Sequence, residues 1–477
     1  MKMLIGGAWV DASDGATCPV VNPATGKTVD TVPNASAEDI DRAIALAVEG
    51  QKEWNAVPLH EKLAVFEKYA ALAEANTERI AKVMCEEGGK PIDQCRTEVA
   101  ANAAIFRIYA SAANTFYGHT LPFNGEVRSE GDVAFTVHEP LGVFACIVPF
   151  NYPFELAAHK TAPMLVTGNA VVLKPASNTP RSALILCELL LEAGIPAKAI
   201  SCITGTGSRV GNLLTQDPRV AAVSFTGSTS VGISIAKNCA AGLRRVSLEL
   251  GGNDPLIIFD DCDWELALSE TIGGRIGNAG QTCCASKRFI VQNGIREKFT
   301  AELVRRLGQV KMGDPSDPTV EMGPVISEKA AIDAMAQIEK AKEQGAKLLC
   351  GGTRDGAFIT PTVLEVTPDM EIAKDEEVFA PVWPIIGFDT MEEALAIANN
   401  TQYGLSSGVI TENIKTAMKV SMGVQAGACI INGTGNYRLA HQPFGGYKHS
   451  GLGREGAVCT LEEMTQQKMV SFKGILK

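Results

Sequence analysis

The stretch Val143-Phe144-Ala145-Cys146-Ile147-Val148-Pro149-Phe150-Asn151 decides the fold of this chain. Its first six residues form an uninterrupted apolar run, which is typical of a strand that is buried on both faces. A sheet is covered on both faces when its strands are parallel and helices form the crossovers. The run is too short to span a bilayer. It therefore predicts a central strand of a parallel sheet, and Pro149 marks its end.

Strands and helices alternate with short links after this run. We expect helices over 153–167, 180–193, near 208–215 and from 228, and strands over 170–173, 199–203, 220–225 and 245–250. This order predicts a doubly wound parallel sheet, in which ligands bind beyond the carboxyl ends of the strands. Residues 255–433 repeat the alternation less regularly, with strands 256–259, 288–291 and 382–388 and a helix over 295–309. They predict a second α/β domain.

The segments that flank these units are different in character. Residues 4–32 predict short strands, and 36–117 predict helices that begin with a capping box at Ser36-Ala37-Glu38-Asp39. Residues 132–139 and 468–476 are typical of exposed strands. Because an unpaired strand edge invites a partner, we interpret 119–139 as an arm that pairs with another subunit, with an ordinary hairpin as the alternative.

Composition excludes several classes of function. The chain has 477 residues and a formal net charge of −11, which argues against nucleic acid or an anionic membrane as the partner. Its 13 cysteines contain no CxxC pair and no Cys/His cluster at zinc spacing, so no metal site is expected. The start of the chain does not have the pattern of a signal peptide. We therefore expect reduced thiols and a cytoplasmic location.

Two loops carry candidate chemistry. The loop Asn278-Ala279-Gly280-Gln281-Thr282-Cys283-Cys284-Ala285-Ser286 holds adjacent cysteines behind a Gly-Gln pair. These residues alone leave open whether Cys283 and Cys284 are a nucleophilic site or small buried side chains. The stretch Gly227-Ser228-Thr229-Ser230-Val231-Gly232 closes a strand and opens a helix, whose free N–H groups suit a phosphate.

Seven stretches, taken together, resemble the aldehyde dehydrogenase superfamily, whose members oxidise aldehydes to acids with NAD or NADP. They are Pro149-Phe150-Asn151-Tyr152-Pro153, Leu173-Lys174-Pro175-Ala176, Phe225-Thr226-Gly227-Ser228, Leu248-Glu249-Leu250-Gly251-Gly252, Gly280-Gln281-Thr282-Cys283, Glu376-Glu377-Val378-Phe379-Ala380-Pro381 and Pro443-Phe444-Gly445-Gly446. They occur in the family's order over nearly the whole chain. The resemblance implies a Rossmann-like NAD(P)-binding domain (1–118 and 140–248), an α/β catalytic domain (249–440) and a β-strand oligomerisation arm (119–139 and 457–477).

The resemblance also assigns the reaction. Cys283 stands at the position of the nucleophile, which attacks the aldehyde carbon, passes hydride to the cofactor and becomes a thioester. The Asn151 amide and the Cys283 backbone N–H stand where relatives stabilise the oxyanion. Glu249 stands at the position of the general base, which favours hydrolysis over transfer to coenzyme A. Glu455 resembles a carboxylate proposed as a proton relay.

For the cofactor, the resemblance implies a site built from the strand ends and the loop around Glu377. Lys174 matches a lysine that holds the adenosine ribose, Ser228 a pyrophosphate contact, and Glu377 the carboxylate that binds the nicotinamide ribose. Ser177 replaces a glutamate that NAD-preferring relatives often carry, and with Arg209 on a neighbouring loop this favours NADP over NAD. The full set of expected cofactor residues is Val148, Pro149, Phe150, Lys174, Ser177, Arg209, Gly227, Ser228, Gly251, Glu377 and Phe379.

The expected substrate site is less well defined. By resemblance, it is lined by Tyr152, Leu156, His159, Thr282, Cys284 and the loop 433–442. Succinic semialdehyde dehydrogenases share the Lys-Pro-Ala-Ser and Gly-Gly-Asn patterns but carry arginine in place of His159. With Arg438 in the loop and Arg107 on a nearby helix, we expect a small, polar, anionic aldehyde.

Two other classes of function remain open from the sequence. One is a dehydrogenase that transfers the acyl group to coenzyme A, which Glu249 disfavours. The other is a catalytically silent relative that acts as a binding protein, which the presence of Cys283, Glu249 and Asn151 together disfavours. A homodimer or homotetramer is expected, and the sequence does not distinguish the two.

Overall fold

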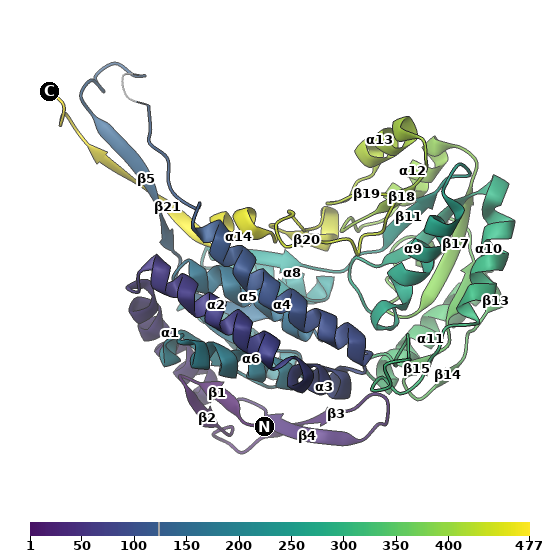
Figure 1. The fold of residues 1–477 in the computed structure, drawn as a ribbon, viewed down its shortest axis with the longest axis horizontal. Coiled ribbons are helices and arrows are strands. Elements are labelled where there is room, and N and C mark those ends of the chain that lie inside the picture. Colours follow the sequence, from purple (N-terminus) through teal and green to yellow (C-terminus); the bar gives the residue numbers. More distant parts are fainter. Residues whose placement is uncertain (123–124) are drawn as a thin grey trace.

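The computed structural model describes residues 1–122 and 125–477. Phe123 and Asn124, which belong to the expected arm, lie outside the described residues. Two large sheets, each with helices on both faces, lie at opposite ends of the chain's body, and a two-stranded ribbon projects from one end (Figure 1). The α/β fold expected from the alternation of strands and helices is therefore confirmed.

The helices and strands have the following bounds. The α-helices are α1 Ala37–Asn55, α2 Leu59–Ala75, α3 Thr77–Gly88, α4 Ile92–Ala113, α5 Pro153–Val166, α6 Pro180–Ala193, α7 Asn212–Gln216, α8 Thr229–Ala240, α9 Trp264–Ile276, α10 Asn293–Leu307, α11 Glu328–Glu343, α12 Met391–Asn399, α13 Ile414–Gly423 and α14 Ala457–Glu463. The strands are β1 Met3–Ile5, β2 Ala8–Val10, β3 Thr17–Val21, β4 Thr28–Pro33, β5 Val133–Pro140, β6 Val143–Ile147, β7 Ala170–Lys174, β8 Ile200–Cys202, β9 Val220–Thr226, β10 Arg245–Glu249, β11 Asp254–Ile258, β12 Ser286–Gln292, β13 Lys347–Cys350, β14 Arg354–Asp355, β15 Phe358–Ile359, β16 Thr362–Glu365, β17 Val382–Phe388, β18 Gly408–Ile410, β19 Ile430–Ile431, β20 Gly451–Leu452 and β21 Thr465–Phe472.

The larger sheet has eight strands in the order β2-β1-β8-β7-β6-β9-β10-β20. Strands β7, β6, β9 and β10 are parallel, and their register places Lys174, Ile147, Phe225 and Leu248 in one row. Each of these residues lies at or next to the carboxyl end of its strand. The loops that follow these strands therefore leave the sheet from the same edge, as expected for a doubly wound fold.

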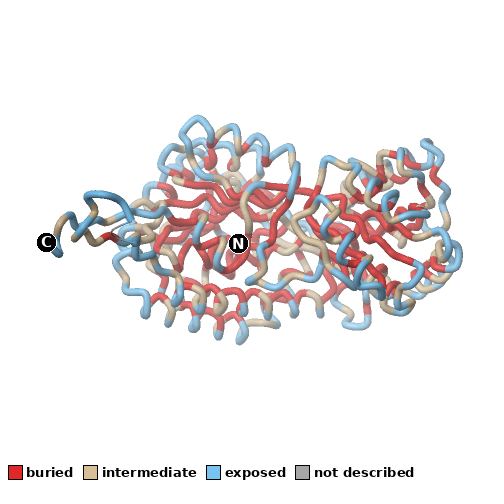
Figure 2. Tube along the Cα trace, turned by 90° about the horizontal axis from the view of Figure 1, so that it is seen from above, coloured by how far each residue is buried: buried red, intermediate tan, exposed pale blue. Residues whose placement is uncertain are grey.

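Strand β6 is buried on both faces, as its apolar run predicted. Phe144 and Cys146 pack into a core on one side of the sheet, while Val143, Ala145 and Ile147 pack into a second core on the other side. Helices α2 to α6 contribute mainly to the first core, and α1, α7 and α8 mainly to the second. The buried residues of the chain are the red segments in Figure 2.

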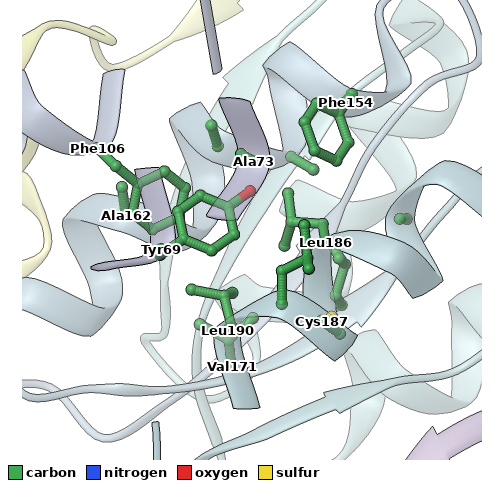
Figure 3. Packing of buried hydrophobic residues seen from close by; sticks show 14 of the residues in the cluster. Tyr69, Ala73, Phe106, Phe154, Ala162, Val171, Leu186, Cys187 and Leu190 are labelled. Carbon is green, nitrogen blue, oxygen red and sulfur yellow. The ribbon is translucent and has the colours of Figure 1, made fainter. Parts of the chain in front are cut away.

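The first core positions α5, the helix that begins directly after Asn151. Figure 3 shows Tyr69, Phe106 and Phe154 packed with residues of α6. The Tyr69 hydroxyl donates to Asn102 Oδ1 at 2.8 Å, and Asn102 Nδ2 donates to the Phe154 carbonyl oxygen at 2.6 Å. This buried chain of hydrogen bonds connects α2 through α4 to the first turn of α5.

The smaller sheet has seven strands in the order β13-β16-β17-β12-β11-β18-β19. Its central strands β11, β12 and β17 are parallel. The loop that carries Cys283 precedes β12, and the loop that carries Glu377 precedes β17. Both candidate loops therefore lie at the amino ends of strands, in contrast to the loops of the larger sheet.

The projecting ribbon consists of β5 and β21, which pair antiparallel from Val133↔Phe472 to Pro140↔Thr465. In this chain, β5 therefore pairs with the C-terminal strand, and a local antiparallel bridge between Thr120 and Phe135 is present as well, so the hairpin alternative is borne out in part. The expected strand over 468–476 is shifted, since β21 begins at Thr465 and residues 473–476 form turns. Pairing of the arm with another subunit stays a prediction, as do the domain boundaries.

The helices described in residues 1–122 and 125–477 include none with the length and apolar character needed to cross a membrane.

We expect Tyr69→Phe to destabilise the chain, because it leaves the buried Asn102 Oδ1 without its donor. The free energy of unfolding should fall by about 1–3 kcal/mol, measured by urea denaturation. Tyr117→Phe is the matched control, since Tyr117 is 72% exposed, and it should change the value by less than about 0.5 kcal/mol. Equal midpoints for the two variants would contradict the role given to this hydrogen bond.

Candidate active site

A cavity of about 570 Å³ lies where the two sheets meet. The larger sheet contributes residues that follow β6, β9 and β10, and the smaller sheet contributes residues that precede β12 and β17. Its lining is Pro149, Phe150, Asn151, Thr226, Gly227, Ser228, Leu250, Gly251, Cys283, Glu377 and Phe379. The structure therefore brings the expected nucleophile together with Asn151 and with most of the expected cofactor residues.

The loop before Cys283 has an unusual backbone. Asn278, Ala279 and Gly280 all have positive φ, at 48°, 53° and 77°. A Cβ at residue 280 would collide with the Ala380 carbonyl oxygen, so only glycine fits there. Arg275 is fully buried and donates Nη1 to the Gly280 carbonyl oxygen at 3.3 Å and Nε to that of Val382 at 3.1 Å. The loop is thus fastened to the start of β17.

Cys283 is partly exposed to the cavity, whereas its neighbour Cys284 is 6% exposed. The interaction with the Cys284 thiol, together with desolvation, raises the pKa of Cys283 well above its ordinary value, whereas the interaction with Cys283 lowers the pKa of Cys284. The nearby cations Lys287 and Arg438 act on Cys283 in the opposite direction and favour its thiolate.

Asn151 lies beside the cysteine loop and is 4% exposed. Its Nδ2 donates to the Gln281 carbonyl oxygen at 2.9 Å, which uses one of the two amide hydrogens. Asn278 Nδ2 in turn donates to the Asn151 carbonyl oxygen at 2.9 Å. The Asn151 side chain is therefore fixed beside the cysteine loop, with an N–H left for a ligand in the cavity.

Glu249 is the last residue of β10 and lies directly before Leu250 and Gly251, which line the cavity. It is 2% exposed, and neither carboxylate oxygen has a hydrogen-bond partner among the described residues. Burial and the nearby charge of Glu455 raise the pKa of Glu249 well above its ordinary value. A carboxyl group in this state is suited to taking up a proton.

Glu455 lies between two cations, the fully buried Lys160 and the half-buried Arg438. Its Oε1 accepts from Lys160 Nζ and its Oε2 from Arg438 Nη2, both at 2.9 Å. These cations outweigh the effect of burial and lower the pKa of Glu455, so it is ionised. The Arg438 guanidinium also stacks on Phe444, 4.0 Å from the ring centroid, and its Nε is buried without a partner.

His159 on α5 is 2% exposed, and its Nδ1 has no partner among the described residues. Burial lowers the pKa of His159 to about 3, with Arg438 acting in the same direction. The imidazole is therefore neutral and serves as a hydrogen-bonding group rather than as a cation. Of His159 and Arg438, which were expected to receive an anionic group together, only Arg438 carries a charge.

The other expected substrate residues gather on the same side of the cysteine loop. The Tyr152 hydroxyl lies 3.4 Å from Thr282 Oγ1, and Cys284 Sγ lies 3.7 Å from Asn436 Oδ1. Lys90 Nζ lies 3.6 Å from the centroid of the Tyr152 ring and forms a buried ion pair with Glu98. Arg107 does not belong to this group: it pairs with Glu67 and Glu74 on the surface, so the expectation that it reaches the site is wrong.

A second groove, of about 1440 Å³, begins where the cavity ends and runs along the larger sheet. The expected cofactor residues that line it are Val148, Pro149, Phe150, Lys174, Ser177, Gly227 and Ser228. Ser228 directly precedes α8, whose first N–H groups face a ligand at this end. Lys174 Nζ donates to the Pro175 carbonyl oxygen at 2.8 Å, and burial lowers the pKa of Lys174 to about 8.

Arg209 differs from expectation. It lies in a single turn at Gly207–Gly211, but its guanidinium donates Nε to the Ala35 carbonyl oxygen at 3.0 Å and pairs with Asp14. Arg209 does not line the groove. Its guanidinium is instead paired with the carboxylate of Asp14, which lies far away in the sequence. The structure gives no support to Arg209 as a partner of a cofactor phosphate.

Glu377 lies against the backbone that links the two sheets. Its Oε1 accepts from Gly252 N at 3.2 Å, and a Cβ at residue 251 would collide with its Oε2. Phe150 and Phe379 meet edge to face, with ring centroids 6.0 Å apart, at the junction of the cavity and the groove. Because residue 251 is glycine, the Glu377 carboxylate can lie against the backbone there.

Sequence reasoning missed two buried lysines. Lys160 is the only charged side chain in the middle of a helix that is buried along its length, and Lys287 is 1% exposed at the start of β12. A charge without a polar face in an apolar segment is the signal that could have identified Lys160, whereas Lys287, between Ser286 and Arg288, carries no such signal. In the part of the chain that the structure describes, no group of three or more His, Cys, Asp or Glu side chains has an arrangement suited to a metal ion.

Comparison with known proteins agrees with this geometry. A sequence model of the aldehyde dehydrogenase family matches residues 9–470. An aldehyde dehydrogenase from Brucella melitensis biovar abortus 2308 is 39% identical, with a TM-score of 0.95 over 98% of this chain and 96% of that chain. An NADP-dependent enzyme from E. coli is 35% identical, with a TM-score of 0.96 over 99% and 98%.

A betaine aldehyde dehydrogenase from Staphylococcus aureus, solved in complex with NAD⁺, is 34% identical, with a TM-score of 0.95 over 99% of this chain and 97% of that chain. The family match and these structures cover almost the whole length on both sides. The chain therefore belongs to the aldehyde dehydrogenase family and is an NAD(P)-binding oxidoreductase that acts on aldehydes.

Proposed function

We propose that this enzyme oxidises a small, polar, anionic aldehyde to the free carboxylic acid through a cysteine thioester. The observation that carries the proposal is that Cys283 and Asn151 line one cavity, while the unpartnered carboxyl group of Glu249 belongs to the residue directly before Leu250 and Gly251 in the wall of that cavity. Nucleophile, oxyanion donor and proton acceptor are the three groups that acyl transfer through a thioester needs.

Cys283 attacks the carbonyl carbon of the aldehyde, and the oxygen gains negative charge. The free N–H of the Asn151 amide and the Cys283 backbone N–H stabilise this oxyanion, each for about 3 kcal/mol. The charges of Lys287 and Arg438 stabilise the Cys283 thiolate and so oppose the rise in the pKa of Cys283 that Cys284 and burial cause. Asn151 needs no rearrangement to act, because its bond to Gln281 already fixes the amide.

The NAD(P) cofactor fits the groove and the cavity. The groove has a helix start for the pyrophosphate and Lys174 at its far end, and Glu377 is placed to hold the nicotinamide ribose. When bound, the cofactor accepts the hydride from the cysteine adduct. Phe150 and Phe379 form an apolar wall at the junction and exclude water from the space next to Cys283.

Glu249 acts after oxidation, by removing a proton from the water that attacks the thioester. Its desolvated carboxylate has no hydrogen bond to lose in doing so. Transfer to coenzyme A would need no such base, so the environment of Glu249 supports hydrolysis. The same environment argues against a silent relative, because a buried carboxyl group without a partner is costly to keep.

The charge balance next to the cavity supports an anionic substrate. Lys160 and Arg438 are two cations that share one ionised carboxylate, Glu455. Burial raises the pKa values of Glu249 and Glu155, which reduces their negative charge. An excess positive charge in a buried site is unfavourable, and an anionic group on the substrate would compensate for it.

NADP is the cofactor that the groove favours. No acidic side chain is among the described residues that line the groove, so nothing there repels a 2′-phosphate. Ser177 and Lys174 line the same end and can donate to one. The similarity to an NADP-dependent enzyme from E. coli agrees with this preference, and the similarity to a protein in complex with NAD⁺ leaves dual use possible.

Homo-oligomer assembly through the ribbon of β5 and β21, and a cytoplasmic location, remain part of the proposal. The ribbon projects beyond the body and exposes Met469 and Phe472, at 60% and 45% (Figure 1). Sedimentation of the full chain and of a chain without residues 465–477 would test the assembly.

We expect Cys283→Ala to form no reduced cofactor with any aldehyde, followed by absorbance at 340 nm. Glu249→Gln should give one equivalent of reduced cofactor per active site and then stop, because the thioester is not hydrolysed. In the wild type the rate of this step should rise with pH, since Glu249 must lose the proton that its raised pKa retains.

Glu297→Gln, on the surface of α10, is the control and should turn over normally. Steady turnover by Glu249→Gln without a burst would contradict the role of Glu249. If the wild type forms only one equivalent of reduced cofactor until coenzyme A is added, and then turns over steadily, the result would favour transfer of the acyl group to coenzyme A.

We expect wild-type kcat/KM to be higher with NADP than with NAD. Ser177→Glu should lower kcat/KM for NADP by at least about tenfold, because the new carboxylate repels the 2′-phosphate. Ser177→Ala, which adds no charge, should keep the wild-type preference. A wild-type preference for NAD of tenfold or more would overturn the proposal of NADP.

We expect Arg438→Ala to raise KM for an acidic aldehyde by about tenfold or more, because a hydrogen bond between charged groups is lost. KM for propanal, which carries no charge, should change much less. Arg107→Ala is the control, since Arg107 lies outside the site. Equal effects of Arg438→Ala on both aldehydes would argue against an anionic substrate.

A further inference from the structure

Lys287 is a buried charged group beside the nucleophile loop, and the proposed mechanism uses its charge but gives no role to its contacts. It is the second residue of β12, four residues after Cys283, and is 1% exposed. A buried ammonium is costly unless its hydrogens are paired. The position of its partners therefore indicates what the residue does.

Three of these partners are carbonyl oxygens of the cysteine loop. Lys287 Nζ lies 2.5 Å from the oxygen of Cys283, 3.1 Å from that of Thr282 and 3.4 Å from that of Ala285. The side chain thus folds back over the loop that carries the nucleophile. It fixes the peptide units on both sides of Cys283, including the peptide whose N–H faces the oxyanion.

The fourth partner belongs to the cofactor site. Lys287 Nζ lies 3.4 Å from Glu377 Oε1, the oxygen that also accepts from Gly252 N. One ammonium therefore contacts both the nucleophile loop and the carboxylate expected to hold the nicotinamide ribose. Its charge acts on Cys283, favouring the thiolate, and on the buried Asp254, which it stabilises as a carboxylate.

We propose that Lys287 is a positioning residue that fixes the nucleophile loop and divides its charge between the Cys283 thiolate and Glu377. This inference rests on the proposed function only in taking Cys283 as the nucleophile. It follows that the two sites are coupled: a change in the charge of Glu377 alters the field of Lys287 at Cys283. A lysine that only fills space would not give this coupling.

The test is the pH dependence of Cys283 alkylation by iodoacetamide, without cofactor, in the Cys284→Ala background. Peptide mass spectrometry identifies the alkylated residue among the remaining cysteines. Lys287→Met should move the midpoint of alkylation to higher pH and lower the rate at pH 7 by about tenfold, because only the thiolate reacts. Lys287→Arg, which keeps the charge, should restore most of the rate.

Glu377→Gln should move the midpoint in the opposite direction, to lower pH, since the ammonium loses its counter-charge. This variant keeps the inference testable if Lys287→Met does not fold, as judged by circular dichroism. Lys329→Met is the matched control: Lys329 is exposed and pairs with Asp333, so the midpoint should not move. Unchanged midpoints in folded Lys287→Met or in Glu377→Gln would overturn the inference.

Turnover separates the two proposals. If the wild type reduces neither NAD nor NADP with any aldehyde, the proposed function fails, while the alkylation profile still decides the role of Lys287. If the wild type is active and Lys287→Met has the same kcat, the proposed function stands and the inference on Lys287 fails. The expected result is a fall in kcat larger than any change in KM for the aldehyde.

Discussion

The register of the larger sheet is the constraint on which the site depends. Hydrogen bonding between β7, β6, β9 and β10 holds Lys174, Ile147, Phe225 and Leu248 in one row. Because parallel strands all point the same way, the segments after this row must leave at one edge. Asn151, Ser228 and Glu249 are adjacent for this reason, although about a hundred residues separate the first from the last.

The smaller sheet meets this edge with the amino ends of its strands. The loops that hold Cys283 and Glu377 precede β12 and β17, and glycines 251 and 280 remove the side chains that would keep backbone and carboxylate apart. Most charged side chains behind this junction are buried, so each charge needs a balancing group nearby. The pairs of Glu455 with Lys160 and of Glu377 with Lys287 meet this requirement, and they give the site its electrostatic character.

The local pattern of apolar residues predicted most strands of the larger sheet, but few of the short strands at the sheet edges. The run Val143–Val148 is apolar at every position, so β6 and the strands like it were identified within one or two residues. Strands β13, β16, β18 and β20 have four residues or fewer, too few to show a period, and were not predicted. The antiparallel pairing of β20 with β10 joins Leu452 to Leu248, which lie far apart in the sequence, so no local signal could have shown it.

The sequence by itself determined the fold class and the family, because these depend on short motifs and on the period of apolar residues, and the same motifs supplied the reacting groups that we propose. Only the tertiary structure decided how charges are shared. It pairs Arg209 with Asp14, places Arg107 on the surface, leaves His159 neutral and sets Lys287 against Glu377. Electrostatic interactions depend on distance in space and on burial, and residues remote in the chain set both.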